Sequence, residues 1–111
     1  MGTSLLQIQT IYVGPLTGEP GFGRKLIEAL QQLERFEFTG ERAYADAILE
    51  AHGDDQEAGF VGKATLRDLS GMVIWSAQTM RRHGVPGPMA YERIVAELKD
   101  ALVALEESRT A

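Results

Sequence analysis

The feature that most constrains the fold is a long amphipathic stretch near the carboxyl end of the chain. Its apolar residues recur at helical spacing: Tyr91, Ile94, Val95, Leu98, Ala101, Leu102 and Leu105. This spacing predicts a helix over 88–107, in which Pro88 suits the first helical position. A continuous apolar stripe has to be buried, and the inward face of a sheet is the only apolar partner of sufficient size.

Five segments have the composition or the alternation of β-strands. They are residues 5–13, 35–40, 44–51, 60–67 and 72–79. The first segment stops at Gly14-Pro15, and we expect Val73, Trp75 and Ala77 to face inward in the last. Polar turns at 52–57 and 68–71 join the last three segments, so these predict an antiparallel meander.

A second helix is predicted over 20–34, after a loop at 14–21 that is rich in glycine and proline. Because this helix connects the first two strands, we expect those strands to be parallel neighbours. The sequence therefore predicts an α+β fold with the order β-α-β-β-β-β-α. A mixed sheet of four to five strands would carry both helices on one face and leave the other face open.

Composition excludes several classes of protein. The chain has 111 residues, 44% of them hydrophobic, which predicts a single domain over 1–111 with an ordered core at about 5–107. A net charge of −5 argues against binding to nucleic acid, and no apolar run reaches the roughly 18 residues of a membrane helix. The absence of cysteine excludes disulfides, thiolate nucleophiles and thiolate metal sites.

The first residues give a further expectation about location. Residues 1–4 lack the basic and apolar regions of a signal peptide. We interpret Met1-Gly2 as the remnant left after removal of a natural leader.

The glycine-rich segment 18–25 is the strongest candidate for a ligand site. Gly18 and Gly23 have the spacing of a phosphate-binding loop, but Arg24 and Lys25 replace its lysine and hydroxyl positions. Two cations in the first turn of a helix would nevertheless suit a bound anion. We therefore keep, as an alternative function, a small-anion or nucleotide site made by Gly21, Gly23, Arg24 and Lys25; a plain turn is the simpler interpretation.

The remaining polar residues predict no catalytic or metal site. His52 lies with Asp54, Asp55 and Glu57 in a segment that predicts a solvated turn, and their spacing matches no common metal motif. His83 has no partner that would complete a catalytic triad. Asp46 is interpreted as a structural carboxylate that accepts backbone hydrogen bonds from a neighbouring loop. We expect no enzymatic activity, no metal and no cofactor.

Three short motifs and the closing helix carry a resemblance to known proteins. They are Thr10-Ile11-Tyr12-Val13-Gly14-Pro15, Ala45-Asp46-Ala47-Ile48-Leu49, and the hairpin Leu66-Arg67-Asp68-Leu69-Ser70-Gly71-Met72-Val73-Ile74-Trp75-Ser76. Together they resemble small bacterial cell-envelope domains, namely the curli-secretion-type lipoproteins, the lipopolysaccharide-assembly lipoprotein and the amino-terminal domain of TolB. This chain departs from the lipoproteins in having no cysteine for lipidation.

The resemblance implies a non-enzymatic interaction or assembly module of the bacterial cell envelope. Such a module would bind an envelope protein partner, or form a homo-oligomer, through a sheet edge or the open sheet face. The implied location is the periplasm or the outer membrane, reached after removal of a leader, and a cytoplasmic location stays open. The resemblance carries over no catalytic residue.

Overall fold

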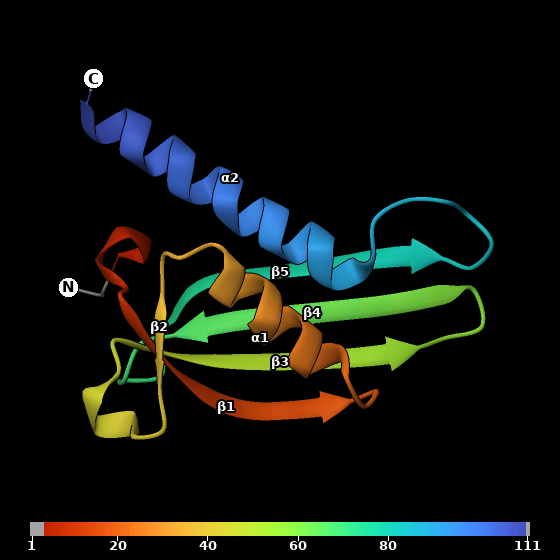
Figure 1. Cartoon of the computed structure of the whole chain (residues 1–111), viewed down its shortest axis with the longest axis horizontal. Coiled ribbons are helices and arrows are strands. Elements are labelled where there is room, and N and C mark those ends of the chain that lie inside the picture. Colours follow the sequence, from red (N-terminus) through yellow and green to blue (C-terminus); the bar gives the residue numbers. More distant parts are fainter. Residues whose placement is uncertain (1–3, 111) are drawn as a thin grey trace.

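The computed structural model describes residues 4–110 and shows a five-stranded sheet with two α-helices packed against it (Figure 1). The strands are β1 (Thr10–Gly18), β2 (Glu37–Thr39), β3 (Ala47–Asp55), β4 (Gly59–Arg67) and β5 (Val73–Arg82). The helices are α1 (Phe22–Gln32) and α2 (Ala90–Thr110), and the short 3₁₀ helices are η1 (Leu5–Gln7) and η2 (Arg42–Tyr44). The predicted α+β fold and its element order are confirmed. Met1-Gly2, interpreted above as the remnant of a leader, lies outside the described residues.

The sheet is mixed and has the strand order β2-β1-β3-β4-β5. Strand β1 is parallel to both β2 and β3, because α1 carries the chain back from the end of β1 to the start of β2. Strands β3, β4 and β5 form the predicted antiparallel meander, in which Ala64 of β4 lies opposite Ala51 on one side and Ala77 on the other.

Both helices cover the same face of the sheet. A Cβ atom built on Gly62 of β4 would lie 2.7 Å from the ring of Phe22 in α1 and 3.1 Å from Cβ of Ala90 in α2. One glycine therefore faces both helices. The large side chains that are almost completely buried lie between these layers: Ile11, Leu26, Leu49, Leu66, Ile94 and Leu98.

The first predicted strand begins and ends later than expected. Leu5 and Ile8 are buried, but they lie in and after η1, and β1 continues through Gly14-Pro15 to Gly18. Pro15 lies in a bulge between Val13 and Leu16, where a proline is tolerated. The missing amide of Pro15 costs little there, since β2 pairs only with Thr10–Tyr12.

The meander also differs from the prediction in its boundaries. Strand β3 begins at Ala47 because Tyr44 belongs to η2, and β3 extends to Asp55, so the turn is shorter than 52–57. Trp75 packs against the core as predicted, but Val73 is 47% exposed. A register shift beside Arg67 places Val73 opposite that residue, on the face without helices.

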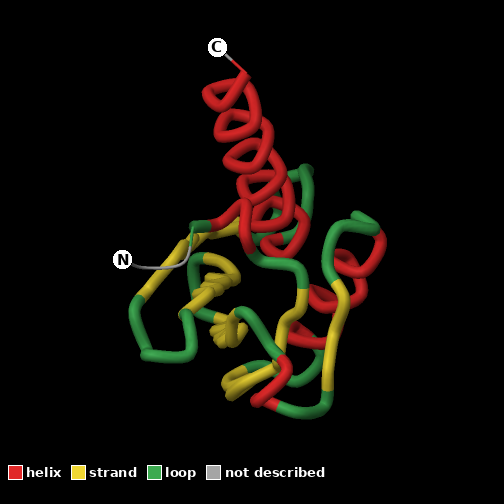
Figure 2. Tube along the Cα trace, turned by 90° about the vertical axis from the view of Figure 1, so that its left-hand side faces the viewer, coloured by secondary structure: helices red, strands yellow, loops and turns green. Residues whose placement is uncertain are grey.

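Helix α2 begins at Ala90, two residues after Pro88. The backbone N–H of Met89 donates to Oε1 of Glu92 at 2.9 Å, which fixes this start. At its other end α2 continues past the strands, as Figure 2 shows. Leu105, the last residue of the predicted stripe, is consequently 40% exposed.

The shared contact at Gly62 gives a test of the layer packing. We expect Gly62→Ala to lower the free energy of unfolding by about 1–3 kcal/mol, since the added methyl group would overlap the Phe22 ring. Gly40→Ala is the matched control: nothing lies within 4 Å of a Cβ there, so its effect should stay within about 0.5 kcal/mol. Urea denaturation measures both, and equal stability of the two variants would contradict the packing.

Candidate functional site

Strand β5 forms one edge of the sheet and leaves backbone groups unpaired. The N–H of His83 donates to the carbonyl of Ala58 at 3.3 Å. In an antiparallel pair, every second residue along a strand directs its backbone N–H and C=O toward the neighbouring strand, and the residues between direct theirs away from it. The backbone groups of Trp75, Ala77, Thr79 and Arg81 therefore point toward β4. Those of Ser76, Gln78 and Met80 point away from the sheet.

This edge has little protection. Within residues 4–110, Nη1 of Arg93 donates to the carbonyl of Met80 at 3.3 Å, whereas the backbone groups of Ser76 and Gln78 have no partner. Both of these residues are exposed. The segment 72–80 contains no charged residue and no proline, the residues that commonly block pairing at an edge strand.

The opposite edge is much less suited to pairing. Strand β2 has three residues and covers only the start of β1. The rest of β1 is interrupted by its bulge and by Pro15, which cannot donate a hydrogen bond. Of the two edges, β5 therefore offers the longer uninterrupted row of backbone donors and acceptors.

The sheet face without helices is mainly polar. His52 Nδ1 lies 2.7 Å from the hydroxyl oxygen of Thr17, and Nε of Arg67 forms an ion pair with Glu50 at 3.1 Å. A shallow hollow on this face is lined by these residues together with Pro15, Ala51, Lys63 and Thr65. Their polarity makes this face a weaker candidate for apolar docking than the β5 edge.

A carboxylate fixes the turn from which β5 starts. Oδ1 of Asp68 accepts hydrogen bonds from the hydroxyl and N–H of Ser70 and from the N–H of Met72. The Ser70 hydroxyl holds the pKa of the Asp68 carboxyl below its usual range; desolvation opposes this shift, and the backbone N–H groups of Met72, Ser70 and Gly71 add to it. Gly71, with φ of +95°, supplies the left-handed conformation that the turn requires.

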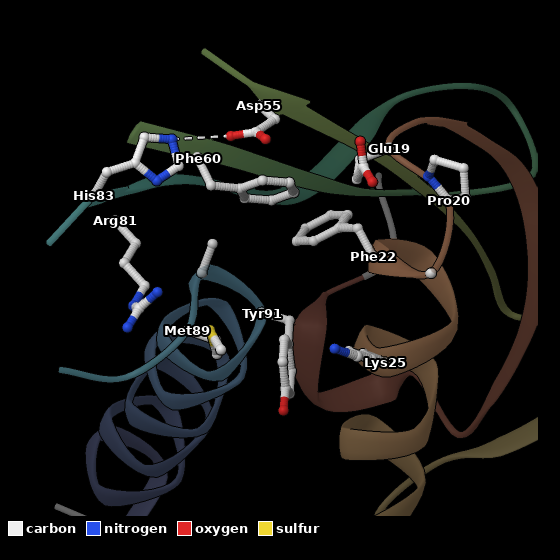
Figure 3. Close-up of a pocket in the computed structure, with 12 residues that line it drawn as sticks. Glu19, Pro20, Phe22, Lys25, Asp55, Phe60, Arg81, His83, Met89 and Tyr91 are labelled. Atoms are coloured by element: carbon white, nitrogen blue, oxygen red, sulfur yellow. Dashed lines mark ion pairs between the residues drawn. The ribbon is translucent and has the colours of Figure 1, made fainter. Parts of the chain in front are cut away.

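A pocket of about 310 Å³ lies where α1 and α2 begin (Figure 3). Its apolar part consists of Phe22, Phe60, Met89 and Tyr91, and the Phe22 and Phe60 rings are tilted with their centroids 5.4 Å apart. The other lining residues are Glu19, Pro20, Gly21, Lys25, Asp55, Arg81, His83 and Ala90.

The charges around this pocket are only partly paired. His83 Nε2 lies 3.0 Å from Oδ1 of Asp55 and 3.1 Å from the carbonyl oxygen of Gln56. Since both neighbours are acceptors, Nε2 carries a proton and donates to them. Within the described residues Lys25 and Arg81 form no ion pair, and the buried Nε of Arg81 has no hydrogen-bond partner.

The residues of the predicted anion site in segment 18–25 do not lie together in the structure. Gly21 and Lys25 line the pocket, whereas Gly23 is buried against the side chain of Leu16 and Arg24 is exposed outside the lining. The sequence analysis assigned neither Arg81 nor Phe60, which come from the meander, to this site. Both residues lie at the same end of two adjacent strands, which could have indicated that they share a site. That inference requires the register of β4 and β5, which the sequence alone does not give.

The other candidate residues do not form a cluster. Asp55 lies opposite Phe60, on the sheet face that the helices cover, whereas His52 and Asp54 of β3 lie on the opposite face. No group of three His, Asp or Glu side chains able to hold a metal ion forms within residues 4–110. Asp46 has the predicted structural role, because its Oδ2 accepts hydrogen bonds from the N–H groups of Gln9 and Thr10 at 2.9 and 3.0 Å.

Known structures share this fold. TolB from Acinetobacter baumannii is 13% identical with a TM-score of 0.54, over 94% of this chain and 29% of TolB. The PelC dodecamer from Paraburkholderia phytofirmans is 17% identical with a TM-score of 0.57, over 91% of each chain. Lipoprotein GNA1162 from Neisseria meningitidis is 13% identical with a TM-score of 0.51, over 88% of this chain and 96% of that one.

These similarities confirm the predicted resemblance to envelope lipoprotein-type domains at the level of the fold. No protein-family model matches the sequence, and no curated protein matches it. The chain spans less than a third of TolB. Among the described residues no helix is long and apolar enough to cross a membrane.

The Asp68 turn predicts a pH dependence of stability. Because the pKa of the folded state is lowered, the ionised carboxylate stabilises the fold above the usual pKa of about 3.9, and this contribution is lost as the pH falls through the lowered value. We expect Asp68→Asn to be less stable than the wild type at neutral pH, with a difference that shrinks on acidification to about pH 2.

Urea midpoints at several pH values measure this difference. Asp100→Asn, at an exposed position of α2, serves as the control for a general change in net charge. A difference for Asp68→Asn that stays constant or grows toward low pH would contradict the assignment.

Proposed function

We propose that this chain is a non-enzymatic assembly module of the bacterial cell envelope that associates through the edge of β5. The fold that it shares with TolB and with a lipoprotein of Neisseria meningitidis supports the envelope assignment. We further propose that it acts in the periplasm or at the outer membrane after removal of a leader.

The observation that carries this proposal is the unpaired backbone of β5. The outward N–H and C=O groups of Ser76 and Gln78 are available to an added strand, which would extend the sheet by main-chain hydrogen bonds. The exposed side chains of Met72, Val73 and Met80 on the same strand and its preceding turn would add apolar contact.

The occupant that we propose is a second copy of the chain. Two β5 strands can pair antiparallel about a twofold axis, and residues 73–80 would bring no like charges together. PelC, which has this fold, is a dodecamer, so the fold is compatible with homo-oligomers. A strand from another envelope protein is the alternative occupant.

A single backbone change tests the edge. Gln78→Pro removes one outward N–H without touching the ladder to β4, and Gln78→Ala removes the same side chain but keeps the amide. We expect a concentration-dependent dimer in sedimentation velocity, and a loss of about 10-fold or more in association for the proline variant alone, since each copy loses a hydrogen bond.

Crosslinking locates the contact independently. The chain has no cysteine, so Ser76→Cys or Gln78→Cys should yield a disulfide-linked dimer under mild oxidation if the two strands pair. Lys99→Cys, on the exposed surface of α2, should not. Self-pairing would be refuted if the protein stays monomeric at high concentration, or if it crosslinks equally well at position 99. If the protein is monomeric but binds a strand of another envelope protein, and Gln78→Pro abolishes that binding, the alternative occupant is favoured.

A further inference from the structure

We propose that Arg93 is a positioning residue that blocks one end of the β5 edge and thereby selects the register in which two copies pair. In that register Ser76 lies opposite Gln78 of the second copy, and Ala77 lies on the twofold axis. The inference rests on the self-pairing proposed above and adds the residue that decides its alignment.

The guanidinium of Arg93 lies on the outer side of β5. Its Nη1 donates to the carbonyl oxygen of Met80 at 3.3 Å, and a Cβ atom on Gly87 would lie 3.6 Å from its Nη2. Because the carbonyl of Met80 points away from the sheet, the guanidinium lies where an added strand would have to pass. Arg93 forms no ion pair within residues 4–110, so no carboxylate draws it away from the strand.

The first turn of α2 holds Arg93 in this position. The hydroxyl of Thr79 donates to the carbonyl of Ala90 at 3.1 Å, which ties the start of α2 to β5 (Figure 1). Arg93 belongs to the same turn, since its N–H donates to the carbonyl of Met89 at 3.1 Å. The guanidinium therefore extends from a helix that is fixed on the strand.

The receptive part of the edge is closed at both ends. Beyond Met80, the carbonyl of Arg82 already accepts a hydrogen bond at 3.4 Å in the turn that follows β5. At the other end, the ladder to β4 skips Ile74 at the register shift. Between these limits, Ser76 and Gln78 are the outward residues whose backbone groups lack a partner in the described part of the chain.

Two free residues favour one twofold register. Outward residues of two antiparallel edges exchange hydrogen bonds only when they lie opposite one another. With Ala77 on the axis, Ser76 and Gln78 of each copy pair with each other across the axis. Placing Gln78 on the axis would set Ser76 against Met80, at the position that Arg93 occupies. Placing Ser76 on the axis would set Gln78 against the irregular start of the strand.

Disulfide trapping reports the register. At a non-hydrogen-bonded position on the axis, the two Cα atoms lie about 4.5 Å apart, within the range of a disulfide. The two copies of Ser76, or of Gln78, would lie diagonally at about 7 Å or more. We expect Ala77→Cys to crosslink about 5-fold faster, or more, than Ser76→Cys or Gln78→Cys under the same mild oxidant.

Removal of the guanidinium should move the register. In Arg93→Ala, pairing centred on Gln78 can engage Met80 as well, so each copy uses three outward residues in place of two. We expect association to tighten about 10-fold, and the fastest crosslink to move from position 77 to position 78. Alanine favours the helix, so α2 should persist. Lys99→Ala removes an exposed cation of the same helix and should change neither result.

A proline at Met80 gives an independent measurement. The N–H of Met80 points outward and has no partner in the register centred on Ala77. We expect Met80→Pro to leave the association of the wild type unchanged. In the Arg93→Ala variant the same change should weaken association about 10-fold, because that N–H is then part of the pairing.

The outcomes separate this inference from the self-pairing on which it rests. A wild-type protein that stays monomeric refutes both. A dimer in which position 77 is not the fastest to crosslink refutes the selected register and leaves self-pairing intact. The same holds for a dimer in which Arg93→Ala does not move the fastest crosslink.

Discussion

The packing of the Phe22 ring onto two glycines of the sheet is the contact on which the rest of the arrangement depends. Cβ atoms on Gly53 and Gly62 would lie 2.9 and 2.7 Å from side-chain atoms of Phe22, so only glycine permits this approach. The approach brings the start of α1 beside Ala90 at the start of α2. The pocket lies where the two helix starts meet over Gly62.

The order of the elements could be predicted because it depends on local patterns. The stripe from Tyr91 to Leu102 and the alternation in β4 each identify an element without knowledge of its neighbours. Pro15 misled the prediction of β1, since a proline ends a central strand but is tolerated at a bulge on an edge. Val73 was assigned to the wrong face because a register shift is not visible in the alternation of one strand.

The candidate sites were less predictable, because both depend on tertiary arrangement. Segment 18–25 drew attention to Gly21 and Lys25, but the pocket residues outside this segment lie at least 30 positions further along the chain. The burial of the unpaired Nε of Arg81 becomes apparent only in the folded structure. Likewise, the strand that forms the free edge follows from the sheet order and not from the composition of 72–80.

The two borders of the sheet differ in a way that limits how many molecules can join. One border is short, bulged and interrupted by Pro15, while the other is longer and uncharged over residues 73–80. Growth of a sheet from molecule to molecule requires two receptive borders, and this molecule has one. Twofold pairing through β5 would occupy this border in both molecules, so the assembly would end as a closed dimer and would not extend into a fibre.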